Sequence, residues 1–374
     1  MKRLLATLAL AGLIAPATAA EPIRIGVVNE ISGPQAEAGR FTLNGIRLAL
    51  DEVNKAGGVL GRSLELRVED NGSTNPGTVL AFSKLASETN RVAGIIGPIR
   101  STQIQAASPT IAKTGIPTMI GGTEPGLTKA GNRWLFRARP NDSYSSRVIA
   151  DFGVNTLKLR KWAIVHTTDA FGTGGKTALM AALKSHGIEP VLVQGYTANS
   201  QDFTPIVLAV KKSGADILGS YFTTAPDQGI FAKQMRQLGV NIAWVGSPAM
   251  IAVSALSLAG EALHGTYAIT DFTIDASDQT RGFGQKYRER YGINPDTYAS
   301  WAYDATHILA NAMRKAGSTE AEAVRSAILG LKGFQGVEGT YEFDESGDGL
   351  HGYNVVRNDK GTITFIKRVD FPAR

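Results

Sequence analysis

The segment with the clearest chemical pattern is DAFGTGGKT, residues 169–177. If Ala170 takes the place of the first glycine, the segment fits the phosphate-binding pattern G-x-x-x-x-G-K-[ST]. An apolar run, KWAIVH, precedes it and a helix-like run, TALMAALKSH, follows it, as such a site requires. No acidic strand end accompanies it to bind a metal, so we expect no nucleotide and interpret Lys176 as a solvated residue of the first helical turn.

Two other turns offer groups that suit a carboxylate. The turn IIGPIRSTQ, residues 95–103, leads from an apolar run into a helix-like segment and places Ser101 at the helix start. A hydroxyl and the free N–H groups of a helix start can hold a carboxylate together. The turn MIGGTEPGLT, residues 119–128, has paired glycines and the hydroxyl of Thr123. Each turn alone also fits a structural role, as a helix cap or an ordinary turn.

Metal and catalytic patterns are weak in this sequence. DESGDG, residues 344–349, imitates the start of a calcium loop, but Val355 stands where the bidentate glutamate belongs, and we interpret the segment as a turn between strands. The five histidines show no metal-binding spacing, and there is no G-x-S-x-G motif. A catalytic triad dispersed along the chain leaves no such motif, so the absence of positive evidence is the basis for the expectation here. We therefore expect no metal, no cofactor and no enzymatic activity.

The elements that position these turns follow a regular alternation. Apolar, β-branched runs, beginning with IRIGVVN, LELRVED and VAGIIG, alternate with longer helix-like runs, and a second series starts after Pro140 with KWAIVHTT, EPVLVQGY, DILGSYF and NIAWVGS. This alternation predicts parallel sheets covered by helices, and 374 residues are too many for one ordinary core. We predict two doubly wound α/β lobes. Ligands of such sheets bind at the carboxyl ends of the strands, where both turns described above lie.

The start of the chain and its composition indicate where the protein works. Lys2 and Arg3 precede LLATLALAGLIA, and small residues, ATAA, end before Glu21, which predicts an export signal over residues 1–20. The apolar run is shorter than the roughly 20 residues of a membrane-spanning helix. The chain has no cysteine, and its net charge of +6 includes no block of like charges, so nucleic acid is not expected as a partner. We expect a periplasmic protein whose mature chain does not insert into a membrane.

Several segments together resemble one family. VNEISGPQAEAGRF, GGVLGRSLEL, IIGPIRSTQIQAASPTIAKTGIPTMIGG, DFTPIV and NPDTYASWAYDAT look like segments of the periplasmic branched-chain amino acid binding proteins, the solute receptors of ABC importers. The resemblance covers essentially the whole chain after residue 20. It implies a monomer of type I periplasmic binding protein fold, with two Rossmann-like lobes joined by a three-crossover hinge, and a membrane permease and ATPase as partners. It assigns residues 21–140 and about 273–333 to lobe 1, and residues 141–272 and about 334–374 to lobe 2.

The resemblance also implies a binding site. Ser101 corresponds to the serine that holds the solute's carboxylate, Thr123 to a second hydroxyl contact, and the carbonyl of Gly121 to the acceptor for the solute's ammonium. The same resemblance adds five further candidate ligand-binding residues: Arg100, Phe171, Tyr221, Ala38 and Asp142. Phe171 stands where the family has a tyrosine, and Ala38 where a bulky aromatic residue often lies.

One departure from the family concerns the solute's ammonium group. The amino acid binders carry a glutamate after a G-x turn, whereas this chain reads VGSPAM with Pro248 near that place. A buried ammonium needs a compensating charge, for which Asp227, Asp142 and Glu124 are the candidates. Two solute classes stay open: a hydrophobic amino acid, and an aromatic or aliphatic carboxylic acid without an ammonium. A sensory receptor of the same fold is a third alternative.

Overall fold

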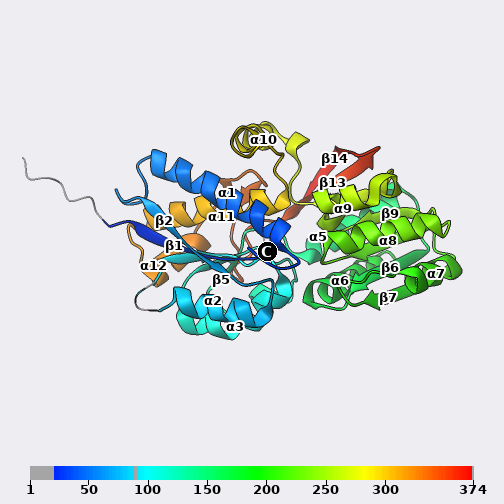
Figure 1. Ribbon diagram of the computed structural model, residues 1–374, viewed down its shortest axis with the longest axis horizontal. Helices are drawn as coiled ribbons and strands as arrows, with labels where there is room; N and C mark the ends of the chain where they lie inside the picture. Colours follow the sequence, from blue (N-terminus) through cyan, green and yellow to red (C-terminus); the bar gives the residue numbers. More distant parts are fainter. Residues whose placement is uncertain (1–20, 88, 90, 373–374) are drawn as a thin grey trace, which may run out of the picture.

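The computed structural model describes residues 21–372 apart from residues 88 and 90, so the expected export signal lies outside the described residues. Two lobes lie side by side along the long axis of the molecule (Figure 1). Each lobe is built around its own sheet. Within the described part of the chain, no helix combines the length and the apolar character needed to cross a bilayer.

Lobe 1 contains a five-stranded parallel sheet in the order β2-β1-β3-β4-β5. Its strands are β1 (Ile23–Asn29), β2 (Leu64–Asp70), β3 (Gly94–Ile96), β4 (Thr118–Ile120) and β5 (Leu135–Arg137). β1 and β2 run in register to their last residues, where Asn29 lies opposite Asp70. The carboxyl ends of the strands therefore meet at one edge of the sheet.

Helices cover both faces of this first sheet. They are α1 (Ala36–Lys55), α2 (Asn75–Leu85), α3 (Ser101–Thr114), α4 (Gly126–Lys129), α10 (Asp278–Tyr291), α11 (Thr297–Ala316) and α12 (Ala321–Leu329). The apolar core on one face includes residues of α1, α10, α11 and α12, and the core on the other face includes residues of α2 and α3. α1 and α11 cross closely because Gly45 has no side chain: a Cβ there would lie 2.1 Å from the carbonyl oxygen of Ala299.

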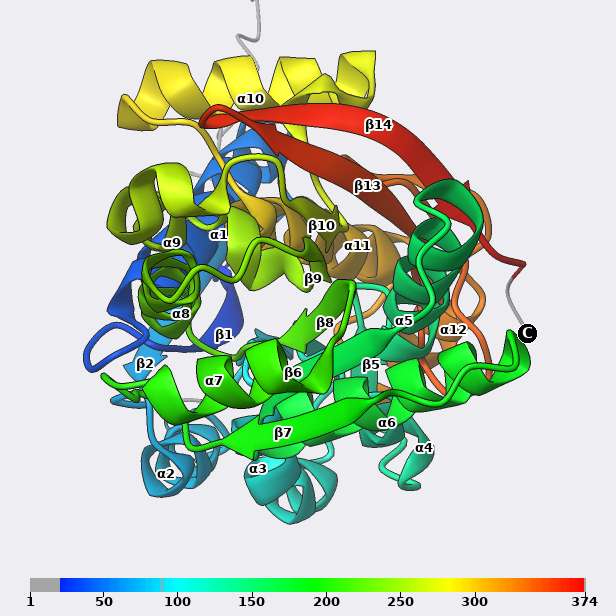
Figure 2. The same ribbon diagram turned by 90° about the vertical axis from the view of Figure 1, so that its right-hand side faces the viewer.

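Lobe 2 repeats the same strand order and extends it. Its sheet runs β14-β13-β10-β9-β8-β6-β7, with β13 and β14 antiparallel at one end. The strands are β6 (Trp162–Thr167), β7 (Leu192–Tyr196), β8 (Ile217–Tyr221), β9 (Ala243–Gly246), β10 (Tyr267–Thr270), β13 (Gly352–Asp359) and β14 (Thr362–Asp370). In Figure 2 the long pair β13–β14 arches over this lobe.

The second sheet is also covered on both faces. Its α-helices are α5 (Asp142–Asp151), α6 (Ala170–Ser185), α7 (Thr204–Ser213), α8 (Ala225–Gln237) and α9 (Val253–Ala259). Short helices of other types are η1 (Phe152–Thr156), η2 (Pro248–Ile251) and η3 (Gly260–Leu263), whereas η4 (Ile274–Ala276) packs against the core of lobe 1. One core includes residues of α7, α8 and α9, and the other includes residues of α5 and α6. The prediction of two doubly wound lobes is confirmed.

Three segments cross between the lobes: one after β5, one after β10 and one before β13. The hairpin β11 (Phe334–Gln335) and β12 (Thr340–Tyr341) precedes the last crossing. Tyr341, Phe343 and Leu350 belong to the core of lobe 1, so residues 334–350, which the sequence analysis assigned to lobe 2, pack with lobe 1. A short apolar hairpin carries no signal in the sequence for which of two cores it joins.

Candidate functional site

A cavity lies between the lobes at the carboxyl ends of both sheets. Lobe 1 lines it with Ile99, Arg100, Ser101, Thr123, Arg139 and Tyr298, and lobe 2 lines it with Phe171, Phe222, Thr223, Pro248 and Ala249. Most of these residues directly follow a strand or begin a helix, as expected for a site in open α/β sheets. The space between their atoms, including its open mouth, is about 440 Å³.

Ser101 brings the start of α3 to the cavity. It is the first residue of this 14-residue helix, and it is buried. Its hydroxyl oxygen accepts a hydrogen bond from the backbone N–H of Glu124 at 3.3 Å, which leaves its own proton for another partner. The first N–H groups of a helix have no partner inside the helix and carry a partial positive charge. This corner of the cavity therefore favours an anion.

Thr123 lies beside Ser101 and is held from behind by Asp142. The Thr123 hydroxyl donates to Asp142 Oδ2 at 2.8 Å, and the backbone N–H of Asp142 donates to the Thr123 carbonyl at 2.8 Å. Burial raises the pKa of Asp142 to about 7, against the opposing hydrogen bonds from Thr123 and Ser145. Asp142 does not line the cavity. Asp142 therefore supports Thr123 from behind.

Arg100 bridges the two lobes. Its Nη1 donates to the backbone carbonyl of Thr223 in lobe 2 at 2.7 Å, and its Nη2 donates to the side-chain carbonyl of Gln35. The guanidinium also lies over the ring of Tyr298, 5.7 Å from its centroid. Its Nε is buried and has no hydrogen-bond partner among the described residues. We refer to the contacts of Arg100 with Gln35 and Thr223 as the Arg100 clasp.

Arg139 brings a second positive charge to the cavity. Its side chain is only 7% exposed and forms an ion pair with Asp271, which directly follows β10. Arg139 Nη1 also donates to the carbonyl of Gly121 at 3.1 Å. Burial by itself would lower the pKa of Arg139, but the adjacent Asp271 carboxylate raises it above its usual value. The guanidinium therefore stays charged.

The remaining lining is mostly apolar. Phe171, from the first turn of α6, contributes an aromatic ring from lobe 2. Phe222, directly after β8, also lines the cavity, but its ring is fully buried against Tyr196 and Phe231. Pro248 and Ala249 begin η2 at the place where the resemblance led us to look for a glutamate. The cavity thus combines an anion-binding corner on lobe 1 with an apolar wall on lobe 2.

Four of the eight predicted site residues, Arg100, Ser101, Thr123 and Phe171, line this cavity, and the other four do not. Tyr221 is fully buried in the core that α5 and α6 cover, with its hydroxyl 2.7 Å from Ser145 Oγ. Ala38 is buried in the core of lobe 1. Asp142 lies behind Thr123, and the Gly121 carbonyl is occupied by Arg139.

Sequence reasoning missed Arg139, Phe222, Thr223 and Tyr298 as lining residues. A signal for two of them was present, because Phe222 and Thr223 come directly after the predicted strand DILGSYF. Arg139 follows β5 in the same way, but a sequence does not show which of several residues after a strand points to the cleft.

No carboxylate lines the cavity among the described residues. Asp227 accepts from the backbone N–H of Asn199 at 2.9 Å and lies at the first turn of α8. Glu124 accepts from the backbone N–H of Gly126 at 2.8 Å and lines a separate groove beside α6. The three carboxylates considered as partners for an ammonium are therefore all engaged outside the cavity.

The glycines of DAFGTGGKT serve helix packing. A Cβ at Gly172 would lie 2.1 Å from the carbonyl oxygen of Thr167, and one at Gly175 would lie 2.2 Å from the ring of Tyr221. Asp169 caps the helix by accepting from the N–H of Gly172 at 2.9 Å. These contacts hold α6 against β6 and β8 and so position Phe171.

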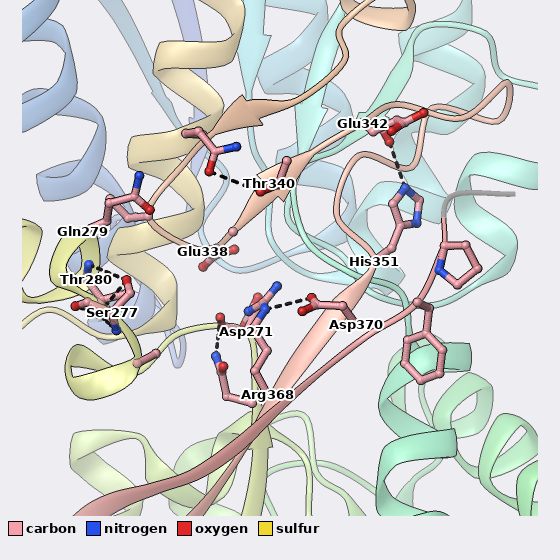
Figure 3. Close-up of a pocket in the computed structure, with 17 residues that line it drawn as sticks. Asp271, Ser277, Gln279, Thr280, Glu338, Thr340, Glu342, His351, Arg368 and Asp370 are labelled. Carbon is pink, nitrogen blue, oxygen red and sulfur yellow. Dashed lines mark hydrogen bonds and ion pairs between the residues drawn. The ribbon is translucent and has the colours of Figure 1, made fainter.

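A second and larger cavity, with about 1030 Å³ of space between its atoms including its open mouth, lies among the crossing segments (Figure 3). Its lining is polar and includes Asp271, Glu338 and Arg368. Burial raises the pKa of Glu338 well above its usual value, and Ser300 Oγ donates to this carboxyl group at 2.6 Å. None of the eight predicted site residues lines this cavity, so we place the candidate solute site between the lobes.

Comparison with known proteins agrees with this architecture. A family model described as periplasmic binding protein matches residues 22–362. The chain belongs to this family. A Leu/Ile/Val-binding protein of Rhizobium johnstonii is 30% identical over 359 residues, which cover 93% of this chain and 94% of that protein. The predicted family resemblance is confirmed.

Solved periplasmic binding proteins share the two-lobed fold. A branched-chain amino acid transporter substrate-binding protein of Streptococcus pneumoniae, solved with isoleucine, matches 92% of this chain and 99% of its own with a TM-score of 0.84 and 26% identity. A solute-binding protein of an ABC transporter from R. palustris, solved with benzoate, matches 94% of this chain and 98% of its own with a TM-score of 0.85 and 18% identity.

Proposed function

We propose that this chain is the periplasmic solute-binding protein of an ABC importer and that its solute is a small carboxylate without an α-ammonium group. One observation carries the proposal: the eleven residues that line the interlobe cavity include two arginines and no aspartate or glutamate. A buried charge needs a partner of opposite sign. Arg139 already has Asp271 as its partner, so the charge of Arg100 and the first N–H groups of α3 make the cavity favour an anion, and no carboxylate among its lining residues is available to an ammonium.

Lobe 1 provides the contacts for the carboxylate. The Ser101 hydroxyl and the first N–H groups of α3 point to the same corner, and the positive charge of Arg100 lies beside it. Hydrogen bonds to a charged group are stronger than those between neutral groups. We expect the solute to dock here first, before the second lobe closes.

Lobe 2 provides the contacts for an apolar body. Phe171, Phe222 and Pro248 form this side of the cavity, and closure places them over the docked solute. The benzoate complex of the R. palustris protein supports the view that this fold accommodates an aromatic acid.

A hydrophobic amino acid is the second candidate, because the Rhizobium johnstonii relative is a Leu/Ile/Val-binding protein. On this alternative Asp142 is the candidate partner for the ammonium, one hydrogen bond behind Thr123. A sensory receptor would have the same cavity as these two importer alternatives and would differ from them in its partner protein. Uptake of the solute by cells that lack the gene separates transport, which is lost, from sensing, which leaves uptake intact.

The experiment that tests the proposal is a panel of solutes measured by thermal stabilisation and then by isothermal titration. The panel pairs leucine, valine and phenylalanine with benzoate-like, phenylpropanoid and short aliphatic acids. A solute that binds only the folded protein adds about 2.7 kcal/mol of stability at 100 times its Kd. Stabilisation by acids without an ammonium supports the proposal, and stabilisation by the amino acids alone contradicts it.

A further inference from the structure

The environment of Arg139 limits the chemistry of the solute next to its carboxylate. Arg139 lines the interlobe cavity together with Ser101 and Thr123, although it is almost completely buried. Its guanidinium is fixed by the ion pair with Asp271 and by a further contact to the hydroxyl of Thr297. It is therefore a rigid part of the cavity wall.

Arg139 occupies the place that the family resemblance assigned to the solute's ammonium. The expected acceptor for that ammonium, the carbonyl of Gly121, already accepts a hydrogen bond from Arg139 Nη1 at 3.1 Å. An ammonium bound to the same carbonyl would lie beside a guanidinium in a cavity with little water. Like charges repel, although the Asp271 carboxylate offsets part of the charge of Arg139. The site therefore disfavours a positively charged group on the carbon next to the solute's carboxylate, which is where an α-amino acid carries its ammonium.

The hydrogen bonds of Arg139 leave one of its N–H groups unassigned. A guanidinium has five N–H groups. Nε donates to Asp271, Nη2 donates to Asp271 and Thr297, and Nη1 donates to Gly121. Nη1 carries two hydrogens, so one N–H remains without a partner among these contacts. An oxygen atom of the solute that accepts a hydrogen bond would suit this remaining N–H of Arg139.

Building on the proposed function, we propose that Arg139 selects carboxylates that carry an oxygen on the carbon next to the carboxylate, namely 2-oxo and 2-hydroxy acids. The carboxylate docks at Ser101 and the start of α3, and the 2-oxygen accepts the remaining N–H of Arg139. The apolar body of the acid contacts Phe171 and Pro248. Arg139 thereby replaces the solute's own ammonium with a cation that belongs to the protein.

The test uses the wild-type protein and acids that share one carbon skeleton, so it does not depend on a variant that folds. Isothermal titration compares 4-methyl-2-oxopentanoate, its 2-hydroxy analogue, 4-methylpentanoate and leucine, and then phenylpyruvate, phenyllactate, 3-phenylpropanoate and phenylalanine. In at least one series we expect the 2-oxo or 2-hydroxy acid to bind at least tenfold more tightly than the unsubstituted acid. The amino acid is expected to bind weakest.

The outcomes separate this inference from the function beneath it. Equal affinity for the oxygenated and unsubstituted acids overturns the role of Arg139 and leaves a carboxylate binder. Tightest binding of the amino acid overturns both the role of Arg139 and the exclusion of an ammonium. No binding of any carboxylate overturns the proposed function itself.

A variant then assigns the preference to Arg139. Arg139→Met alone leaves Asp271 buried without its ion-pair partner, so the variant to use is Arg139→Met with Asp271→Asn, checked for folding by circular dichroism. Its preference for the 2-oxo acid over the unsubstituted acid is expected to fall to about onefold. The folded variant Asp271→Asn serves as the matched control that retains the guanidinium. An unchanged preference in the folded double variant overturns the proposal.

Discussion

The Ser101 hydroxyl is the side chain that the proposed function depends on most directly. Hydrogen bonds to charged groups contribute about 1.5–3 kcal/mol, and about 1.4 kcal/mol changes a dissociation constant tenfold. We therefore expect Ser101→Ala to weaken binding of the true solute by about 10- to 100-fold, as measured by isothermal titration. Ser83→Ala is the matched control, because Ser83 is exposed on α2 and donates only to the carbonyl of Val79. Unchanged affinity in Ser101→Ala would remove this residue from the site.

Asp142 makes a prediction about stability and pH. Its pKa is raised to about 7 by burial, so the folded state binds the proton more tightly than the unfolded chain does. The contribution of this group to stability is complete below its unfolded pKa and is lost as the pH rises through about 7. Between pH 4 and 7 the Asp142→Asn variant should lack this decline, which has a limiting slope of about 1.4 kcal/mol per pH unit.

The measurement is the difference in unfolding free energy between wild type and variant, from urea titrations at several pH values. Other buried acids titrate in both proteins and cancel in this difference. Asp275→Asn, at an exposed position, is the control that should show a parallel pH profile. A pH-independent difference for Asp142→Asn would contradict the raised pKa.

At the scale of single residues the sequence allowed only part of the site to be predicted. Ser101 and Thr123 follow short apolar strands, and the edge of a parallel sheet brings such turns together. Arg139 was missed because its role depends on Asp271, which is 132 residues away in the chain. Tyr221 lies one position before the residues that line the cavity: it is the last residue of β8 and its side chain belongs to a core, whereas the cavity lies beyond the end of the strand.

At the scale of elements, α6 packs closely against its sheet because Gly172 and Gly175 have no side chains. A Cβ at Gly175 would overlap the buried ring of Tyr221, so Gly175→Ala is expected to lower the unfolding free energy by about 1–3 kcal/mol. Gly282→Ala in α10 is the matched control, since a Cβ there meets nothing within 4 Å and alanine favours a helix. Urea unfolding of both variants checks the difference, and equal stability would show that α6 can shift away from the ring.

The elements themselves were largely predictable, because strands and helices of a doubly wound lobe leave strong periodic patterns. The pattern around DAFGTGGKT was correctly assigned to a helix start but also resembles a phosphate loop, since both need glycine where backbone approaches closely. The destination of the hairpin β11–β12 was not predictable. Its few apolar residues fit either core, and only the packing of Tyr341 against lobe 1 decides between them.

At the scale of the whole molecule, the contacts across the cleft describe a closed arrangement. Besides the Arg100 clasp, the backbone N–H of Ala170 in lobe 2 donates to the Thr102 hydroxyl in lobe 1 at 3.2 Å. Gln35 is a partner of Arg100 that does not line the cavity, so Gln35→Ala weakens closure without changing the solute's contacts. We expect this variant to bind solute about threefold to tenfold more weakly and to have a larger radius of gyration without solute.

Small-angle X-ray scattering with and without solute measures this effect. The exposed Gln105 on α3 provides the matched control variant, Gln105→Ala. Wild type and control should contract on solute addition to the same radius, and Gln35→Ala should reach that radius only at higher solute concentration. A variant as compact as wild type without solute would contradict a role of the clasp in closure.

The Arg100 clasp has a consequence for how the receptor would bind to the proposed importer. Its partners are Gln35 and the backbone of Thr223, and neither belongs to the solute. The clasp therefore stabilises the closed shape of an empty molecule as well as that of a loaded one. If an importer recognises the closed shape, closed receptors without solute compete with solute-loaded receptors for the same binding site on the importer. In the proposed importer, the strength of the two contacts of the clasp therefore sets a compromise between retaining the solute and engaging the transporter without it.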